Sequence, residues 1–170
     1  MLSNAGTIFV GGPAKFNQDI NANNVQGISP EDYTQSISLL SNQDDFQFNV
    51  ITMPGLNQSQ HSTEVAQLIN MCQERGDAIA VVDLAPYNST LLTYTGEAAE
   101  LNSSYAASYA PWLRVSDPGT GQLIWVPAST VIPGVYAFND RVAEPWFAPA
   151  GLNRGGLSTV IKPERKYTQS

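Results

Sequence analysis

Residues 112–126 read Trp-Leu-Arg-Val-Ser-Asp-Pro-Gly-Thr-Gly-Gln-Leu-Ile-Trp-Val and predict a β-hairpin. Two short apolar strands, 112–116 and 122–126, flank the turn-forming segment Asp117–Gly121. Proline presets one backbone dihedral of such a turn, and glycine accepts the positive φ that tight turns require. Pro127 then ends the second strand, because proline has no N–H to donate to a sheet.

Upstream of the hairpin, the sequence predicts a parallel strand–helix–strand unit. Alternating apolar residues over 46–50 indicate a strand that stops at Pro54-Gly55. A helix is expected over 62–75, with Gly76 ending it, and the continuous apolar run 78–84 is typical of a strand buried on both faces. The apolar face of this helix has helical spacing: Val65, Leu68, Ile69 and Cys72. A strand, helix and strand in this order form a βαβ unit with a right-handed crossover.

The N-terminal part of the chain predicts a strand, a loop and a helix. Thr7–Val10 is a short apolar run closed by Gly-Gly-Pro and is interpreted as a buried strand, whereas residues 14–28 are interpreted as a loop. Ser29 is the expected N-cap of the helix, with Pro30 at its first position and Asp32 completing a capping box. The helix places Tyr33, Ile37 and Leu40 on one face, and Ile28 is placed to pack against Tyr33 across its start.

Four further elements are expected in the second half of the chain. Residues 96–108 are rich enough in alanine and glutamate for a third helix. Ser129 is a candidate cap of a short helix that tolerates Pro133 only in its first turn or as a break. Residues 146–156 are expected to be irregular, and 157–161 to form a last strand.

These elements predict an α/β fold, with α+β as the alternative. The expected architecture is a mixed sheet with a parallel βαβ core flanked by helices, plus the hairpin near 112–126. At 170 residues the chain fits one domain over 1–170, with 163–170 as a flexible tail.

The composition excludes several classes of protein. A formal net charge of −7 argues against a nucleic-acid partner, whose phosphates require clustered lysine and arginine, and the basic cluster 162–166 is interpreted as solvated tail. The single cysteine, Cys72, excludes an internal disulfide, and no apolar run is long enough to span a membrane. Charged residues are only 14% of the chain, which suits either a surface packed against copies of itself or a merely polar surface.

No catalytic, cofactor-binding or metal-binding residue is predicted. Gly6–Gly12 lacks the Lys-Ser/Thr of a phosphate-binding P-loop, so Asp83 is interpreted as a strand-end residue that accepts hydrogen bonds from backbone donors. His61 precedes a helix start and is expected to be exposed there, while Cys72 is expected in the core. One histidine and one cysteine cannot form a metal site. The acidic residues Asp44, Asp45, Glu97 and Glu100 are expected to be solvated.

The three tryptophans have two interpretations. Large rings near proline and glycine fill a core seam or anchor a neighbouring subunit. The core is favoured for Trp112 and Trp125, and both roles remain open for Trp146.

A set of clusters in a fixed order resembles the contractile tail sheath proteins of bacteriophages and related contractile injection systems. The resemblance covers roughly residues 45–162. It rests on Asp77–Asp83 with Pro86, Tyr109 with Pro111-Trp112, Asp117-Pro118, Trp125-Val126-Pro127, Gly134–Ala137 with Asn139-Asp140, Trp146 with Pro149-Ala150-Gly151, and Asn153-Arg154-Gly155.

The resemblance implies a structural subunit and not an enzyme. Such subunits form hexameric rings around a tail tube, contact a baseplate, and contract to drive the tube through the host envelope during genome delivery. No cofactor, nucleic acid or membrane insertion is implied, and the location is the virion, with assembly in the host cytoplasm. Family members run to several hundred residues, so the chain is expected to be a fragment that lacks the terminal arms and is mostly monomeric alone.

Two alternative functions come from other classes of protein. A flavodoxin-like α/β enzyme or ligand-binding domain requires a polar cleft at the carboxyl ends of the strands, near Pro54-Gly55 and Asp83–Pro86. A decoration or adhesion protein of the virion is the second rival.

Overall fold

The computed structural model describes residues 30–144 and 146–167 and contains two three-stranded sheets. The predicted α/β class is confirmed, and the parallel and antiparallel strands that we expected in one mixed sheet lie in two. The predicted strand Thr7–Val10, the loop 14–28 and the cap Ser29 lie outside the described residues. No helix within the described part of the chain is long and apolar enough to cross a bilayer.

The first sheet is parallel and has the order β1-β2-β3, formed by Val50–Asn57, Ile79–Asp83 and Ala106–Ser108. The predicted βαβ unit is confirmed, because α2 (Ser62–Arg75) connects β1 to the parallel strand β2. Gly76 ends α2 as predicted, with φ 73° and its N–H donating to the Cys72 carbonyl.

The predicted bounds of β1 were wrong. The strand begins at Val50 and continues through Pro54 and Gly55 to Asn57, with a register shift against β2 between Thr52 and Asn57. This irregularity accommodates Gly55, whose φ is 99°. Proline is tolerated because β1 is an outer strand of the described sheet, where one side needs no ladder donor.

The predicted helix over 96–108 was also wrong in its bounds. The helix is α3 (Leu91–Glu100), and Thr90 caps it by accepting a hydrogen bond from the Thr93 N–H at 3.2 Å. Residues 106–108 form β3, which pairs in parallel with β2. The secondary structure of residues 106–108 is therefore set by pairing with a distant strand and not by local helix propensity.

The second sheet is antiparallel and has the order β5-β4-β6, formed by Leu123–Val126, Leu113–Ser116 and Val160–Pro163. The predicted hairpin is confirmed, with Leu113 opposite Val126 and Ser116 opposite Leu123. Its turn is held by Asp117, whose carboxylate accepts from the Gly119 N–H at 3.0 Å and from the Thr120 hydroxyl. β6 lies about three residues later than the predicted last strand, so Lys162 lies in a strand and not in a tail.

Two helices and a 3₁₀ turn complete the fold: η1 (Ala128–Thr130), α4 (Ile132–Val142) and α5 (Gly151–Arg154). Pro133 lies in the first turn of α4, as predicted. Ser129 is not the helix cap, because Val131 occupies that position and Ser129 lies inside η1. α5 is a short helix in a segment that we expected to be irregular throughout.

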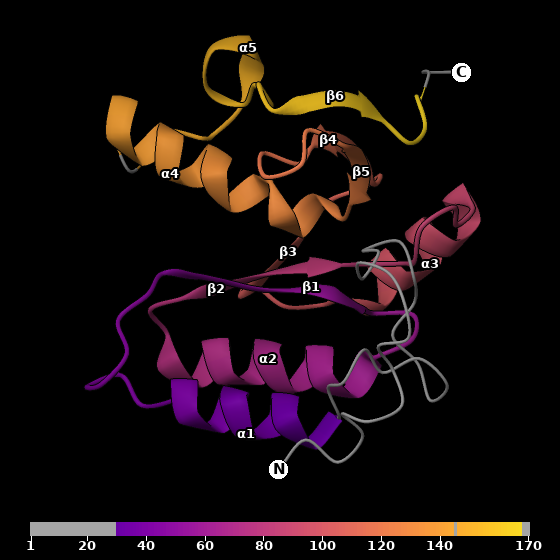
Figure 1. Ribbon diagram of the computed structural model, residues 1–170. Helices are drawn as coiled ribbons and strands as arrows, with labels where there is room; N and C mark the ends of the chain where they lie inside the picture. Colours follow the sequence, from indigo (N-terminus) through magenta and orange to yellow (C-terminus); the bar gives the residue numbers. More distant parts are fainter. Residues whose placement is uncertain (1–29, 145, 168–170) are drawn as a thin grey trace.

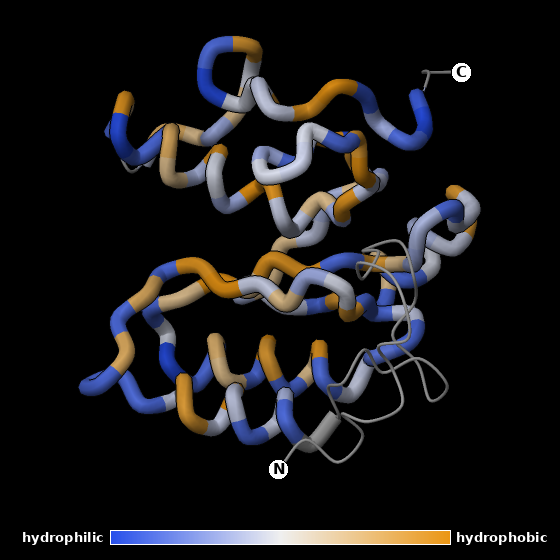
Figure 2. The backbone as a smooth tube through the Cα atoms, in the orientation of Figure 1, coloured by the Kyte–Doolittle hydropathy of each residue, from blue (hydrophilic) through white to orange (hydrophobic). Residues whose placement is uncertain are grey.

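The elements form layers around the parallel sheet. α1 (Pro30–Leu40) and α2 cover one face, and α4 lies on the other face together with the antiparallel sheet (Figure 1). The main core lies under the helices, and a second core around Val81 and Leu113 joins the two sheets. Figure 2 shows the same arrangement as hydrophobic segments on the strands and on the helix faces that meet them.

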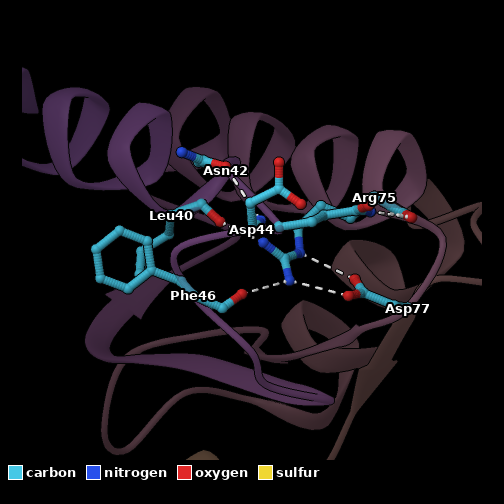
Figure 3. Close-up of polar contacts among 7 residues, drawn as sticks. Leu40, Asn42, Asp44, Phe46, Arg75 and Asp77 are labelled. Carbon is cyan, nitrogen blue, oxygen red and sulfur yellow. Dashed lines mark hydrogen bonds and ion pairs between the residues drawn. The ribbon is translucent and has the colours of Figure 1, made fainter.

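A buried arginine ties the two helices of the first layer to the loop between α1 and β1. The Arg75 side chain is 1% exposed and forms a bidentate ion pair with Asp77, with both N–O distances at 2.9 Å. Its guanidinium also donates to the Leu40 carbonyl at 2.7 Å and to the Phe46 carbonyl at 2.9 Å (Figure 3). The centre of the Phe48 ring lies 4.2 Å from the guanidinium carbon of Arg75. Four hydrogen bonds and one π face therefore surround this cation.

Candidate functional site

Asp83 connects the two sheets by hydrogen bonds at the carboxyl end of β2. Its carboxylate accepts from the Ser129 N–H at 3.1 Å and from the Ser129 hydroxyl at 2.5 Å, across 46 positions in sequence. The prediction that Asp83 caps backbone donors is confirmed, although sequence gave no indication of the partner. The residue is 5% exposed, and burial raises the pKa of its carboxyl to about 6 despite both hydrogen bonds.

The carboxyl ends of the parallel strands, where α/β proteins bind nucleotides, are filled by the protein itself. The indole Nε1 of Trp112 donates to the Ala85 carbonyl at 3.0 Å. The Tyr87 ring contacts both indoles, with its centroid 5.8 Å from that of Trp112 and 5.3 Å from that of Trp125. The backbone N–H groups of residues 58 and 59 donate to the carbonyls of Asp83 and Leu84. This packing does not favour the flavodoxin-like alternative.

Cys72 lies in the core as predicted, whereas His61 is less exposed than predicted. His61 is the N-cap of α2 and half-buried, and its Nδ1 accepts from the Asn57 N–H at 3.2 Å. We expected it to be exposed, and this hydrogen bond accounts for the difference. Cys72 is fully buried in the main core, and burial raises the pKa of its thiol to about 11, which makes it a poor nucleophile.

The acidic residues do not converge on a site. Asp44 and Asp45 are exposed in the loop after α1, and Glu97 and Glu100 lie on α3. Within the described residues no group of three histidine, cysteine or carboxylate side chains is arranged to hold a metal ion.

The strongest candidate for function is an exposed apolar surface at the end of α4 and around α5. We call it the C-terminal apolar surface and define it by five residues: Phe138, Val142, Trp146, Phe147 and Leu152. Trp146 is 77% exposed and Leu152 is 99% exposed. The Asn139 side chain, itself buried, donates to the Phe147 carbonyl at 2.9 Å and so holds the 146–150 segment against α4. This hydrogen bond fixes the backbone at Phe147 beside α4.

An open groove of about 900 Å³ adjoins this surface between α4 and the α5–β6 segment. Its walls are mostly apolar and include Val131, Val135, Phe138, Leu152 and Leu157. Two guanidinium groups border the apolar side chains, Arg141 over the Phe138 ring at 5.5 Å and Arg154 over the Phe147 ring at 4.8 Å. Neither has a carboxylate partner among the residues that the structure describes.

An apolar patch with exposed aromatic anchors and a cationic rim can bind another protein surface. Trp112 is buried, which confirms its core interpretation, and Trp125 is half-buried and packs against the same core cluster, whereas Trp146 is exposed. The sequence missed Leu152, because one leucine between glycine and asparagine produces no periodic pattern.

Comparisons with known proteins agree on one family. A family model described as the phage tail sheath protein central domain matches residues 26–170. The tail sheath protein of Enterobacteria phage T4 is 34% identical over 83 residues, which are 49% of this chain and 13% of that protein. The tail sheath protein of Vibrio phage KVP40 is 47% identical over 36 residues, which are 21% of this chain and 5% of that protein. The matched regions are thus a small part of each relative's length.

Proposed function

Because this chain belongs to the phage tail sheath family, through that family's central domain, we propose that it is part of a structural subunit of a contractile phage tail sheath. The subunit polymerises around the tail tube and contracts to drive the tube through the host envelope during genome delivery. Its partners are other sheath subunits in hexameric rings, the tail tube and the baseplate. It resides in the virion tail after assembly in the host cytoplasm.

The observation that carries this proposal is the C-terminal apolar surface. An exposed tryptophan and an exposed leucine are costly to leave in water, and burial against a neighbour removes that cost. We assign this surface to contacts between subunits, with Trp146 and Leu152 as its anchors.

The proposed role is mechanical and requires no reaction centre. Rearranged subunit contacts supply the work of contraction, so the subunit needs neither a nucleotide nor a metal. The internal packing at the carboxyl ends of β1 and β2 supports this, because the usual nucleotide position of an α/β sheet is occupied by Trp112, Tyr87 and Ser129. The chain by itself is proposed to be a monomeric part of a longer subunit.

The test is assembly of the longer subunit that contains this chain. Trp146→Asp and Leu152→Asp each place a carboxylate in the proposed contact, so both variants should fail to form tubes in electron microscopy and sedimentation. Leu39→Asp is the matched control, since Leu39 is 61% exposed on α1, on the other side of the parallel sheet (Figure 1).

Circular dichroism of the purified variants separates a lost contact from a lost fold. Normal tube formation by both Trp146→Asp and Leu152→Asp would show that the C-terminal apolar surface is not a contact between subunits. Failure of the unsubstituted subunit to form tubes or to join assembled tails would overturn the sheath function itself.

A further inference from the structure

α3 exposes two leucines and carries two glutamates. Leu91 is 51% exposed and Leu92 is 81% exposed, while Tyr94 of the same helix is buried in the core. Glu97 and Glu100 follow further along the helix, which contains no lysine or arginine. Neither carboxylate forms an ion pair with a described residue. We call Leu91, Leu92, Glu97 and Glu100 the α3 surface.

The groove beside the C-terminal apolar surface offers the complementary groups. Phe138 and Leu152 contribute exposed apolar side chains to it, and Arg141 lines it. Arg154 lies on α5 at the border of the same surface. Neither arginine forms an ion pair with a described residue, and this includes the acidic residues that are near Arg141 in the sequence. Leucines and carboxylates of an incoming surface would therefore meet apolar walls and unpaired cations.

The other exposed apolar side chains fit this groove less well. Leu39 stands alone on α1, and Asp32 of that helix already has an interaction partner. Leu123 and Ile161 lie on β5 and β6, and the basic cluster 162–166 lies in and directly after β6. That region of the molecule would repel the two arginines of the groove.

α3 and the groove lie far apart on one molecule. In Figure 1, α3 lies at the right and the C-terminal end of α4 lies at the left. One copy therefore cannot place α3 in its own groove, and contact between the two surfaces requires a second copy. A contact between two different surfaces is heterologous, so every copy that joins leaves one α3 and one groove free for the next.

We propose that the groove between α4 and the α5–β6 segment binds the α3 surface of a second copy of this chain. Leu91 and Leu92 pack against the apolar walls, and the two glutamates of α3 lie beside Arg141 and Arg154. This is a helix-in-groove contact, in which opposite charges at the rim set the register. The inference rests on the proposed function and assigns the partner of the C-terminal apolar surface. Repeated from copy to copy, the contact builds a ring or a helical array.

Charge reversal in the longer subunit that contains this chain tests the pairing. One variant combines Arg141→Glu with Arg154→Glu, and another combines Glu97→Arg with Glu100→Arg. Each places like charges in the contact and should raise the subunit concentration needed for tube formation by at least about tenfold. All four substitutions together restore opposite charges and should restore assembly.

The matched control is Asp44→Arg with Asp45→Arg, which makes the same change of charge at exposed residues of the loop after α1 and should assemble normally. Circular dichroism of each variant verifies the fold. Failure of the unsubstituted subunit to form tubes would overturn the proposed function and this inference together. Tubes that tolerate both reversals, or a fourfold variant that assembles no better than its parents, would overturn this inference alone.

Engineered disulfides supply a second measurement in assembled tubes. Leu92→Cys and Leu152→Cys in the same subunit should give a ladder of linked dimers, trimers and larger species in non-reducing electrophoresis, and each single substitution only monomers. The native Cys72 is fully buried, with its thiol pKa raised to about 11, and competes little. Dimers from Leu152→Cys alone would show that two grooves face each other. That result, or monomers from the double variant, would refute the α3 contact.

Discussion

Replacing Arg75 by alanine should destabilise the fold more than removal of any exposed cation. The substitution leaves the carbonyls of Leu40 and Phe46 without the donors that they have at 2.7 and 2.9 Å. Each part-buried acceptor left unpaired costs about 1–3 kcal/mol, and the lost contact with the Phe48 ring adds about 1 kcal/mol. Asp77 contributes less, because its side chain is 46% exposed and regains water. The sum is a loss of about 3–7 kcal/mol in the free energy of unfolding, and the lower half of this range matches measured costs of breaking buried ion pairs.

Urea denaturation followed by tryptophan fluorescence measures this loss, and the melting temperature should fall by about 10 °C. Arg75→Lys keeps the charge but not the planar fork, so its loss should be smaller, about 2 kcal/mol. Arg141→Ala is the matched control, because Arg141 is exposed over Phe138 and should cost under about 0.5 kcal/mol. If Arg75→Ala were as stable as the Arg141 control, this network would not be what holds α1, α2 and the α1–β1 loop together.

Asp83 should make stability fall with rising pH, because its folded pKa of about 6 lies above its ordinary value of 3.8. The contribution of protonated Asp83 to the free energy of unfolding is complete below about pH 4 and lost by about pH 6. A pKa difference of about two corresponds to about 3 kcal/mol. Asp83→Asn should flatten this dependence of stability on pH, measured by denaturant titrations at each pH. Trp112→Ala should cost about 3–5 kcal/mol and Trp146→Ala under about 0.5 kcal/mol in urea melts, because only the first ring is buried; equal losses would contradict the assignment. Gly76→Ala should lose about 1 kcal/mol because of its φ of 73°, whereas Gly134→Ala within α4 should gain up to about 1 kcal/mol in thermal unfolding.

The parts of the fold that the sequence predicted are those fixed by local chemistry. The hairpin follows from Asp117–Gly121, whose side chains and glycines build the turn without help from elsewhere. The end of α2 follows from Gly76, because a left-handed residue after a helix favours glycine. The buried strand β2 follows from an unbroken apolar run.

The parts of the fold that the sequence predicted wrongly depend on contacts between distant segments. Residues 106–108 form a strand because β2 offers them an edge, and their own sequence, Ala-Ala-Ser, favours no strand. We expected Pro54 to end β1. However, β1 is an outer strand of the described sheet, and a register shift against β2 accommodates the proline. Ser129 was assigned to a helix cap, because its true partner, Asp83, is 46 positions away.

The candidate surface was only half predictable. The sequence left Trp146 open between core and interface, since an aromatic residue among prolines has no periodic neighbours that indicate which way it faces. The Asn139 hydrogen bond to the Phe147 carbonyl fixes the adjacent backbone beside α4, and no sequence pattern indicates this contact.

The connection between the two sheets has a mechanical consequence. β6 is held to β4, the residue after β6 donates to the Trp112 carbonyl, and Trp112 in turn holds the loop after β2. Asp83 and Ser129 add a second tie a short distance away. A pull applied to β6 is therefore passed through β4 and Trp112 to the loop after β2, so force on the antiparallel sheet reaches the parallel sheet.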